Sequence, residues 1–189
     1  SIANAPINSN LIELHIRLVD GGKLTNFLFN SLTEKSILRI EGPKGSFFLR
    51  EDSECPIIFI AGGTGFGPIK AIIEHLINIS SNRVIHLYWG VRSEEDLYSS
   101  LPSEWSEMYD NISFEPVLSE AGQSWNGKKG YVHESVVDDF QDLTDYEVYS
   151  CGPPVMVNAS HKSCLEYKLP KENFFSDAFE YANVISENE

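Results

Sequence analysis

The chain has 189 residues, of which 42% are hydrophobic and 22% are charged, as in an ordinary globular protein. It has no run of about 18 apolar residues that could span a bilayer and no signal-peptide pattern, so we expect a soluble, cytoplasmic protein without a membrane partner. The formal net charge of −14 argues against nucleic acid as a partner, because phosphate backbones are bound by clustered Lys and Arg. The acidity favours solubility or the steering of a basic protein partner.

The three cysteines, Cys55, Cys151 and Cys164, are odd in number and widely spaced, so the sequence predicts neither a disulfide framework nor a zinc site. An iron–sulfur cluster would need four thiolates. No Ser-His-Asp set and no metal-spaced cluster of His and Cys stands out. We therefore expect no metal site in these residues, and neither a hydrolase nor a metalloenzyme.

The first part of the chain has the pattern of antiparallel β structure. Apolar and polar residues alternate over Leu11–Leu18, which is the period of a half-buried strand. Further strands are expected at Ser36–Ile40 and Gly45–Leu49, which a Gly-Pro turn joins. His15 and Arg17 would lie on one face of the first strand, where surface residues are usually solvated. These residues look like part of a β-barrel, although they are too few to close one.

A glycine-rich segment, Asp20–Leu28, lies between the first two of these strands. It places Gly21, Gly22 and Thr25 before an apolar helical run. Exposed backbone amides together with a hydroxyl can form an anion site. A hairpin turn without a ligand is the alternative interpretation.

After Cys55 the pattern changes to apolar strands that alternate with helical stretches, which predicts a parallel sheet covered by helices. We expect strands at Ile57–Ile60, Val84–Trp89, Ser113–Leu118, Glu147–Ser150 and Phe174–Ala178, and helices at Pro68–Ile77 and Pro154–Leu169. The predicted fold class is α/β, with a partial antiparallel β-barrel in residues 1–52 and a Rossmann-like nucleotide-binding domain in residues 53–189.

A buried strand runs directly into a glycine-rich turn and then a helix over Ile58–Pro68. Gly62, Gly63 and Gly65 would let the backbone approach an anion closely, and the start of the helix would point free amides and the positive end of its dipole at a phosphate. Pro68 occupies the place of the last glycine of the G-x-G-x-x-G fingerprint. The alternative is a tight strand-to-helix turn that binds nothing.

A second turn, YSCGPPVM over Tyr149–Met156, also leaves the carboxyl end of a strand. In an open α/β sheet, ligands bind in the crevice outside these strand ends, so both turns can face one ligand. Cys151 would then lie at the mouth of the site. The alternative interpretation is that Cys151 is a small buried hydrophobic side chain with no role in binding, as is usual for a free cysteine.

A third strand-end turn, LYWGVRSEEDLY over Leu87–Tyr98, offers Arg92 to a nucleotide. The acids that follow, Glu94, Glu95 and Asp96, would repel a 2′-phosphate and suit an unphosphorylated ribose. Alternatively, they form the first turn of a helix, where the dipole favours acids.

Eight segments occur in a characteristic order: SIANAP from Ser1, LHIR from Leu14, GGKLT from Gly21, GPKGSFFLR from Gly42, AGGTGFGP from Ala61, YWGVR from Tyr88, SCGPPVM from Ser150 and FFSDAF from Phe174. Together they resemble the ferredoxin–NADP reductase superfamily, in which a flavin-binding β-barrel precedes an NAD(P)-binding α/β domain. The resemblance covers essentially the whole chain. It is greatest to CDP-6-deoxy-Δ3,4-glucoseen reductases and related NAD(P)H–flavin reductases, followed by the reductase components of aromatic or alkane oxygenases.

The resemblance implies a flavin-dependent oxidoreductase that moves hydride from NADH to FAD and passes electrons on to an iron–sulfur centre, a protein or a free flavin. The flavin would supply the difficult chemistry, and the protein would supply alignment and electrostatics. Fold does not fix function, so a nucleotide-binding module without turnover is the alternative from another class.

The resemblance also implies roles for single residues. Ser1 would hydrogen-bond near flavin N5, and Cys151 would lie beside the nicotinamide. Asp177 stands where many relatives carry a glutamate, so it would tune charge or relay a proton. Phe179 would cover the flavin ring until the nicotinamide displaces it. The implied cofactor contacts are Ser1, Ile2, Ala3, His15, Ile16, Arg17, Gly21, Gly22, Lys23, Leu24, Thr25, Gly62, Gly63, Thr64, Gly65, Pro68, Gly90, Arg92, Glu120, Cys151, Gly152, Pro153, Met156 and Phe179.

The sequence departs from the superfamily pattern near Glu120 and at Ser1. Glu120 follows Ser119 where NADP-specific relatives often place an arginine, so we expect NADH rather than NADPH. An arginine and an aromatic residue normally precede the serine of the first motif, whereas this chain starts at that serine. We therefore expect a piece truncated at its N-terminus, with half of the flavin barrel missing and weak or no retention of FAD. A [2Fe–2S] cluster is expected only in a missing N-terminal region.

Overall fold

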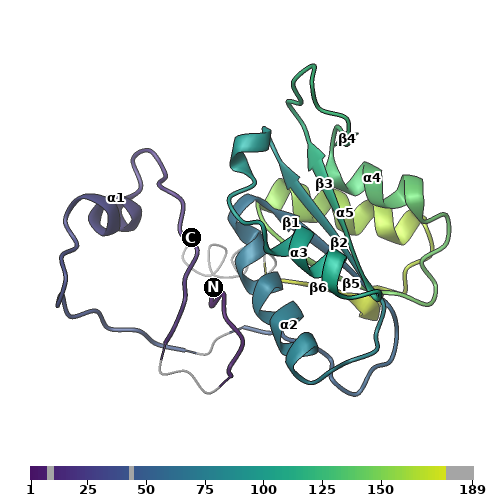
Figure 1. Cartoon of the computed structure of the whole chain (residues 1–189), viewed down its shortest axis with the longest axis horizontal. Helices are drawn as coiled ribbons and strands as arrows, with labels where there is room; N and C mark the ends of the chain where they lie inside the picture. The colour runs from purple at the N-terminus through teal and green to yellow at the C-terminus, as the bar shows by residue number, and fades with distance from the viewer. Residues whose placement is uncertain (8–10, 43–44, 178–189) are drawn as a thin grey trace, which may run out of the picture.

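A computed structural model describes residues 1–7, 11–42 and 45–177 of the chain. Its centre is a six-stranded sheet in the order β4-β3-β2-β1-β5-β6, in which every neighbouring pair is parallel (Figure 1). The strands are β1 Ile57–Gly62, β2 Ile85–Val91, β3 Ile112–Leu118, β4 Lys128–Lys129, β5 Glu147–Cys151 and β6 Phe174–Ser176. The predicted parallel α/β sheet is confirmed. The predicted end of the last strand at Ala178 lies outside the described residues.

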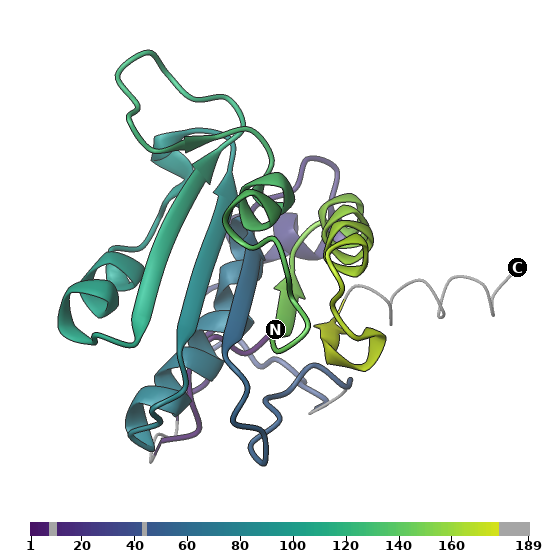
Figure 2. The same ribbon diagram turned by 90° about the vertical axis from the view of Figure 1, so that its right-hand side faces the viewer.

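Helices cover both faces of the sheet and make a three-layer structure (Figure 2). One core lies on the side of α2 (Phe66–Asn78) and α3 (Leu101–Met108), and the other lies on the side of α4 (Val132–Asp139) and α5 (Pro154–Glu166). Short 3₁₀ turns are η1 Gly63–Gly65, η2 Glu94–Asp96 and η3 Lys171–Asn173. The helices predicted at 68–77 and 154–169 correspond to α2 and α5.

The central strand β1 explains why this part of the sequence was so apolar. All of its residues are buried, because β2 and β5 pair on either side and helices cover both faces. Ile57 is in register with Ile85 of β2 and Glu147 of β5. The chain proceeds from β1 to β2 on one side and returns later to β5 on the other. The strand order therefore reverses at β1, and its carboxyl end is the topological switch point.

The three strands predicted before Cys55 are wrong in the residues that the structure describes. Leu11–Leu18, Ser36–Ile40 and Gly45–Leu49 have no strand ladder, and an isolated antiparallel bridge joins Ile2 to Leu14. A strand needs a hydrogen-bonding partner along its length, and alternation of apolar residues cannot supply one. Many of the alternating residues are exposed instead.

The glycine-rich segment at 20–28 leads into a helix, as its apolar run indicated, and it is not a hairpin turn. Helix α1 (Lys23–Asn30) begins after Gly22, and the Thr25 hydroxyl closes the turn by bonding to Val19. Figure 1 shows α1 and its flanking loops set apart from the sheet. Within the described ranges, none of the helices has the length and apolar character needed to cross a bilayer.

A buried network joins the segment at 50–55 to the amino end of the sheet. The Arg83 guanidinium bonds the Glu147 carboxylate at 2.7 Å and the Cys55 carbonyl at 2.7 Å. The backbone amide of Arg50 donates to the Tyr149 hydroxyl at 3.0 Å, and that hydroxyl donates to Glu147. The division after residue 52 stays a prediction, and it falls within this joint.

Candidate functional site

A cleft of about 1690 Å³ lies along the carboxyl edge of the sheet, at the switch point. Its walls come from the turns after β1, β2 and β5, from the start of α4, and from residues 15–20 of the N-terminal part, by which we mean the described residues before Cys55. The structure therefore brings together the three strand-end turns that the sequence singled out separately. The predicted site residues that line it are Ser1, His15, Ile16, Arg17, Gly62, Gly63, Thr64, Gly65, Pro68, Gly90, Arg92, Cys151, Gly152, Pro153, Met156 and Asp177.

Other predicted site residues lie away from this cleft. Ala3 is fully buried against helix α2. Glu120 is exposed at the margin, where its amide donates to the carbonyl of Arg92. Phe179 lies outside the described residues. The predicted residues that do not line the cleft are Ile2, Ala3, Gly21, Gly22, Lys23, Leu24, Thr25 and Glu120.

The turns after β1 and β5 pack directly against each other. A Cβ on Gly65 would stand 2.1 Å from the carbonyl oxygen of Cys151, and one on Gly62 would stand 2.5 Å from the sulfur of Met156. Gly63 adopts a positive φ of 51°. Two of the three motif glycines are therefore required by close packing between the turns, and the third by its backbone conformation. Together they form one bare backbone wall of the cleft.

Aromatic side chains of β2, α2 and the segment after η2 pack next to the Gly62–Gly65 turn. The Trp89 indole on β2 donates to the carbonyl of Gly63 at 2.9 Å. Its ring stacks on Phe66 at 4.3 Å between centroids and meets the edge of Tyr98 at 5.0 Å. Aromatic pairs of this kind add to the free energy of packing, so these contacts stabilise the position of the turn.

Cys151 is buried, with 4% of its surface exposed, yet it lines the cleft. Its thiol donates to an Asp177 carboxylate oxygen at 3.1 Å. Burial raises the pKa of the thiol well above its ordinary value, and the negative charge of Asp177 raises it further. The thiol is therefore neutral near pH 7. It can act as a donor and a packing group in the cleft, but not as a thiolate nucleophile.

The acids after Arg92 form the single 3₁₀ turn η2, so their interpretation as the start of a helical turn is confirmed. Asp96 accepts from the amide of Ser93 at 3.2 Å and lies 4.0 Å from the Arg92 guanidinium. Glu95 and Asp96 also line the cleft, whereas Glu94 does not. The cleft is thus acidic next to its exposed arginine.

Some lining residues were not predicted. Tyr98 ends the third strand-end turn, and Ser119 follows β3. The segment 131–134 opens α4 directly after the short strand β4. The strand-end rule would have found Ser119, but β4 is too short to give a recognisable pattern. Across the described ranges no group of three or more His, Cys, Asp and Glu side chains could hold a metal ion.

Two family models match the chain. The model described as "Oxidoreductase NAD-binding domain" matches residues 59–162, and "Oxidoreductase FAD-binding domain" matches residues 1–49. The first of these matches spans all three strand-end turns of the cleft. The second spans the N-terminal part that forms its opposite wall.

Individual proteins are similar over nearly the whole chain. Protein RfbI of Salmonella typhimurium is 48% identical over 100% of this chain and 56% of its own length. CDP-6-deoxy-L-threo-D-glycero-4-hexulose-3-dehydrase reductase of Yersinia pestis is 45% identical over 95% of this chain and 54% of its own. The crystal structure of Amycolatopsis cytochrome P450 reductase GcoB superposes with a TM-score of 0.84 at 32% identity, covering 94% of this chain and 54% of that one. The chain thus spans about half the length of these curated relatives.

Proposed function

The chain belongs to the ferredoxin–NADP reductase superfamily of oxidoreductases with an FAD-binding and an NAD-binding domain, and on that premise we propose that it moves hydride from NADH to FAD and passes electrons to an acceptor. One observation carries this proposal. The flavin-type segment with Ser1 and residues 15–17 and the three strand-end turns line the same cleft. A reductase needs both cofactors side by side, whereas a module that only binds a nucleotide does not.

The residues of the cleft fit a dinucleotide. The backbone of Gly62–Gly65 lines the cleft and would offer its amides to a pyrophosphate. Helix α2 follows directly and adds the positive end of its dipole. Arg92 and Arg17 bring cations to the same cleft. When bound, NADH supplies the hydride and FAD accepts it, while the protein supplies alignment and electrostatics.

Cys151 and Asp177 would act beside the nicotinamide. The neutral, buried thiol places no charge there, and its hydrogen bond to Asp177 fixes its orientation. Asp177 would keep a negative charge or hold a proton at its carboxylate next to the reacting ring. Ser1 opens onto the same cleft and would donate its hydroxyl proton toward the flavin.

The acceptor is proposed from the relatives. The Yersinia protein is named as the reductase of a CDP-hexulose dehydrase, which favours a sugar-dehydratase partner for this chain. The GcoB structure is that of a cytochrome P450 reductase, which makes an oxygenase the second candidate. The net charge of −14 suits a basic docking surface on either partner.

NADH is proposed as the hydride donor rather than NADPH. The acids Glu95 and Asp96 line the cleft, and Glu120 lies at its margin beside Arg92. A 2′-phosphate there would meet negative charge. The Michaelis constant should therefore be lower for NADH, and the change Glu120→Arg should move the ratio of the two constants toward NADPH by about tenfold, the effect of about 1.4 kcal/mol. A wild-type preference for NADPH would reject this assignment.

The function itself is tested by anaerobic reduction. The purified chain is mixed with excess FAD and NADH, and flavin absorbance near its visible maximum is followed against a mixture that lacks the protein. We expect protein-dependent bleaching of the flavin. Binding of NADH without any bleaching, both by this chain and by a protein of the relatives' full length that contains it, would support the nucleotide-binding module and reject the reductase.

A further inference from the structure

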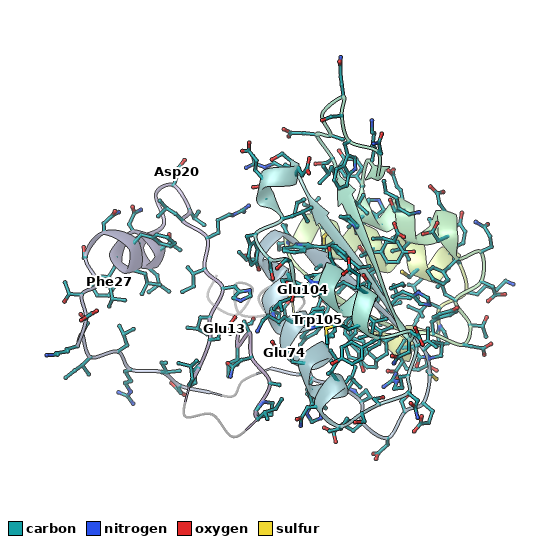
Figure 3. All side chains as sticks on the ribbon, viewed as in Figure 1. Glu13, Asp20, Phe27, Glu74, Glu104 and Trp105 are labelled. Carbon is teal, nitrogen blue, oxygen red and sulfur yellow. The ribbon has the colours of Figure 1, made fainter. Side chains whose placement is uncertain are left out.

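Lys70 on α2 is a buried lysine, and two of its three partners come from the N-terminal part of the chain. It is 5% exposed, although lysine is almost never buried without a partner. Its ammonium donates to the carbonyl of Ala3 at 2.9 Å and to the Glu13 carboxylate at 3.3 Å, and it pairs with Glu74 on its own helix at 2.7 Å. We call these four residues the Lys70 clamp. In Figure 3 the labelled Glu13 and Glu74 lie at the boundary between the N-terminal part and α2.

The clamp joins two segments of the N-terminal part, one at Ala3–Ala5 and one at Glu13. The amide of Ala3 donates to the carbonyl of Glu13 at 2.8 Å, and the amide of Ala5 donates to the Glu74 carboxylate at 3.2 Å. Two segments of the N-terminal part are therefore tied to each other and to one helix. Removing the ammonium would leave Glu13 and Glu74 close together without the cation between them, so the segments would separate from α2.

A second contact lies on the cleft side of the clamp. His15 Nε2 lies 2.6 Å from the Glu13 carboxylate, and His15 Nδ1 lies 2.8 Å from the Tyr98 hydroxyl. A carboxylate only accepts, so Nε2 donates to it. Both His15 and Tyr98 line the cleft. Glu13 thus links the buried ammonium to a cleft residue of the flavin-type segment.

Gly67, in the first turn of α2, makes this approach possible. A Cβ on Gly67 would stand 3.3 Å from the Cβ of Ala3 and 3.3 Å from the Cβ of His15. Glycine inside a helix costs about 1 kcal/mol relative to alanine. At Gly67 this cost is offset by close contact with both segments of the N-terminal part, so the last glycine of the AGGTGFGP motif serves the boundary.

We propose that Lys70 is a positioning residue: it clamps Ala3 and Glu13 to α2 and thereby sets where Ser1 and His15–Arg17 stand relative to the Gly62–Gly65 turn. This inference rests on the proposed function, since the distance between the two cofactors would follow from that placement. Helix α2 carries both the end of the glycine turn and the clamp, so it is one rigid link between them. A misplacement of about 1 Å can lower a hydride-transfer rate by about 100-fold.

The first test needs no cofactor. Amide exchange of the ¹⁵N-labelled chain is followed by NMR in the wild type and in Lys70→Met, which keeps the length of the side chain but removes its charge. We expect protection at Ala3, Ala5 and Glu13 to fall by about tenfold or more, while β1 amides stay unchanged. The matched control is Lys162→Met, which removes an exposed ion pair with Glu166 on α5 far from the boundary.

The second test separates positioning from nucleotide binding. In Lys70→Met with saturating FAD and NADH, single-turnover flavin bleaching should slow by about tenfold or more, while the dissociation constant for NADH stays within about twofold. Lys70→Arg, which can reach the same acceptors, should restore most of both the rate and the amide protection.

Three results would overturn the proposal. They are wild-type amide exchange in Lys70→Met, absence of protection at Ala3 and Glu13 in the wild type, and an NADH dissociation constant that rises as much as the rate falls. If neither this chain nor a protein of the relatives' full length that contains it bleaches flavin, the proposed function fails, and the exchange measurement alone decides whether the clamp exists.

Discussion

The residues before Cys55 and those from Ile57 onward contain similarly apolar stretches but meet water very differently. Ile60 in β1 is fully buried, whereas Ile12 is 53% exposed and Ile37 is 98% exposed. The difference is one of partners. β1 has a strand on each side and a layer of helices on each face, while the described N-terminal residues pair at a single bridge and meet α2 through scattered side-chain contacts, among them the Lys70 clamp. Burial, and with it stability, therefore follows from pairing rather than from hydrophobicity.

The largest expected effect tests this contrast with one substitution in both regions. Phe59→Ala in β1 removes a fully buried ring that packs against Tyr149 and should lower the free energy of unfolding by about 3–5 kcal/mol. Phe29→Ala on α1 removes a ring that is 55% exposed and should change it by less than about 0.5 kcal/mol. Urea denaturation followed by Trp fluorescence measures both. Equal losses would mean that the N-terminal part is packed as tightly as the sheet.

A smaller effect is expected where the sheet meets the proposed chemistry. Cys151→Ala removes the hydrogen bond to Asp177, so flavin reduction should slow by roughly tenfold to 100-fold through loss of alignment. Cys151→Ser keeps a donor of similar size and should lie nearer to the wild type. Single-turnover bleaching gives the rates, and a parallel denaturation curve shows whether the fold is intact. Wild-type rates in Cys151→Ala would remove this residue from the proposed mechanism.

The sequence predicted the sheet part well because its signals are local. Long apolar strands and the strongly periodic helices α2 and α5 were found, and each strand-end turn carried its own glycine. Helices α3 and α4 were not predicted, since each is short and only part of it is buried. Strand β4 has two residues and so no period to detect.

Contacts between distant segments were beyond local patterns. The predicted strands before Cys55 failed because a strand depends on a neighbour that the pattern does not name. In the sequence, Lys70 is one polar residue in an apolar helical stretch that includes Ile69 and Ile72. Nothing in that stretch predicts Ala3 or Glu13 as its partners. The sequence identified the glycines of the β1 turn, but as residues that would bind a phosphate. Their packing against Cys151 and Met156 depends on a turn that is distant in sequence, so the local pattern could not predict it.

The smallest expected effect uses pH to separate the two regions. His86 on β2 contacts Ser113 of β3 and the ring of Phe140. Burial lowers its pKa below the ordinary value of 6.5, and the negative charge of Asp139 opposes part of this shift. The unfolded chain therefore binds the proton more readily, and the sheet part should be fully stabilised above pH 6.5 and lose stability as the pH falls below it. His161 adds to this loss, because burial lowers its pKa too.

The N-terminal part should respond in a lower pH range. The hydrogen bond from His15 holds the pKa of Glu13 below its ordinary value of 4.5, so the contribution of this carboxylate is present above pH 4.5 and lost below it. Denaturation curves at pH 7, 6 and 5 should show falling stability, and His86→Asn should flatten the decline. Amide protection at Ala3 should survive to pH 5. The opposite result would be loss of amide protection at Ala3 at a higher pH than the loss of stability. It would mean that a group other than Glu13 determines the pH dependence of the contact between the two regions.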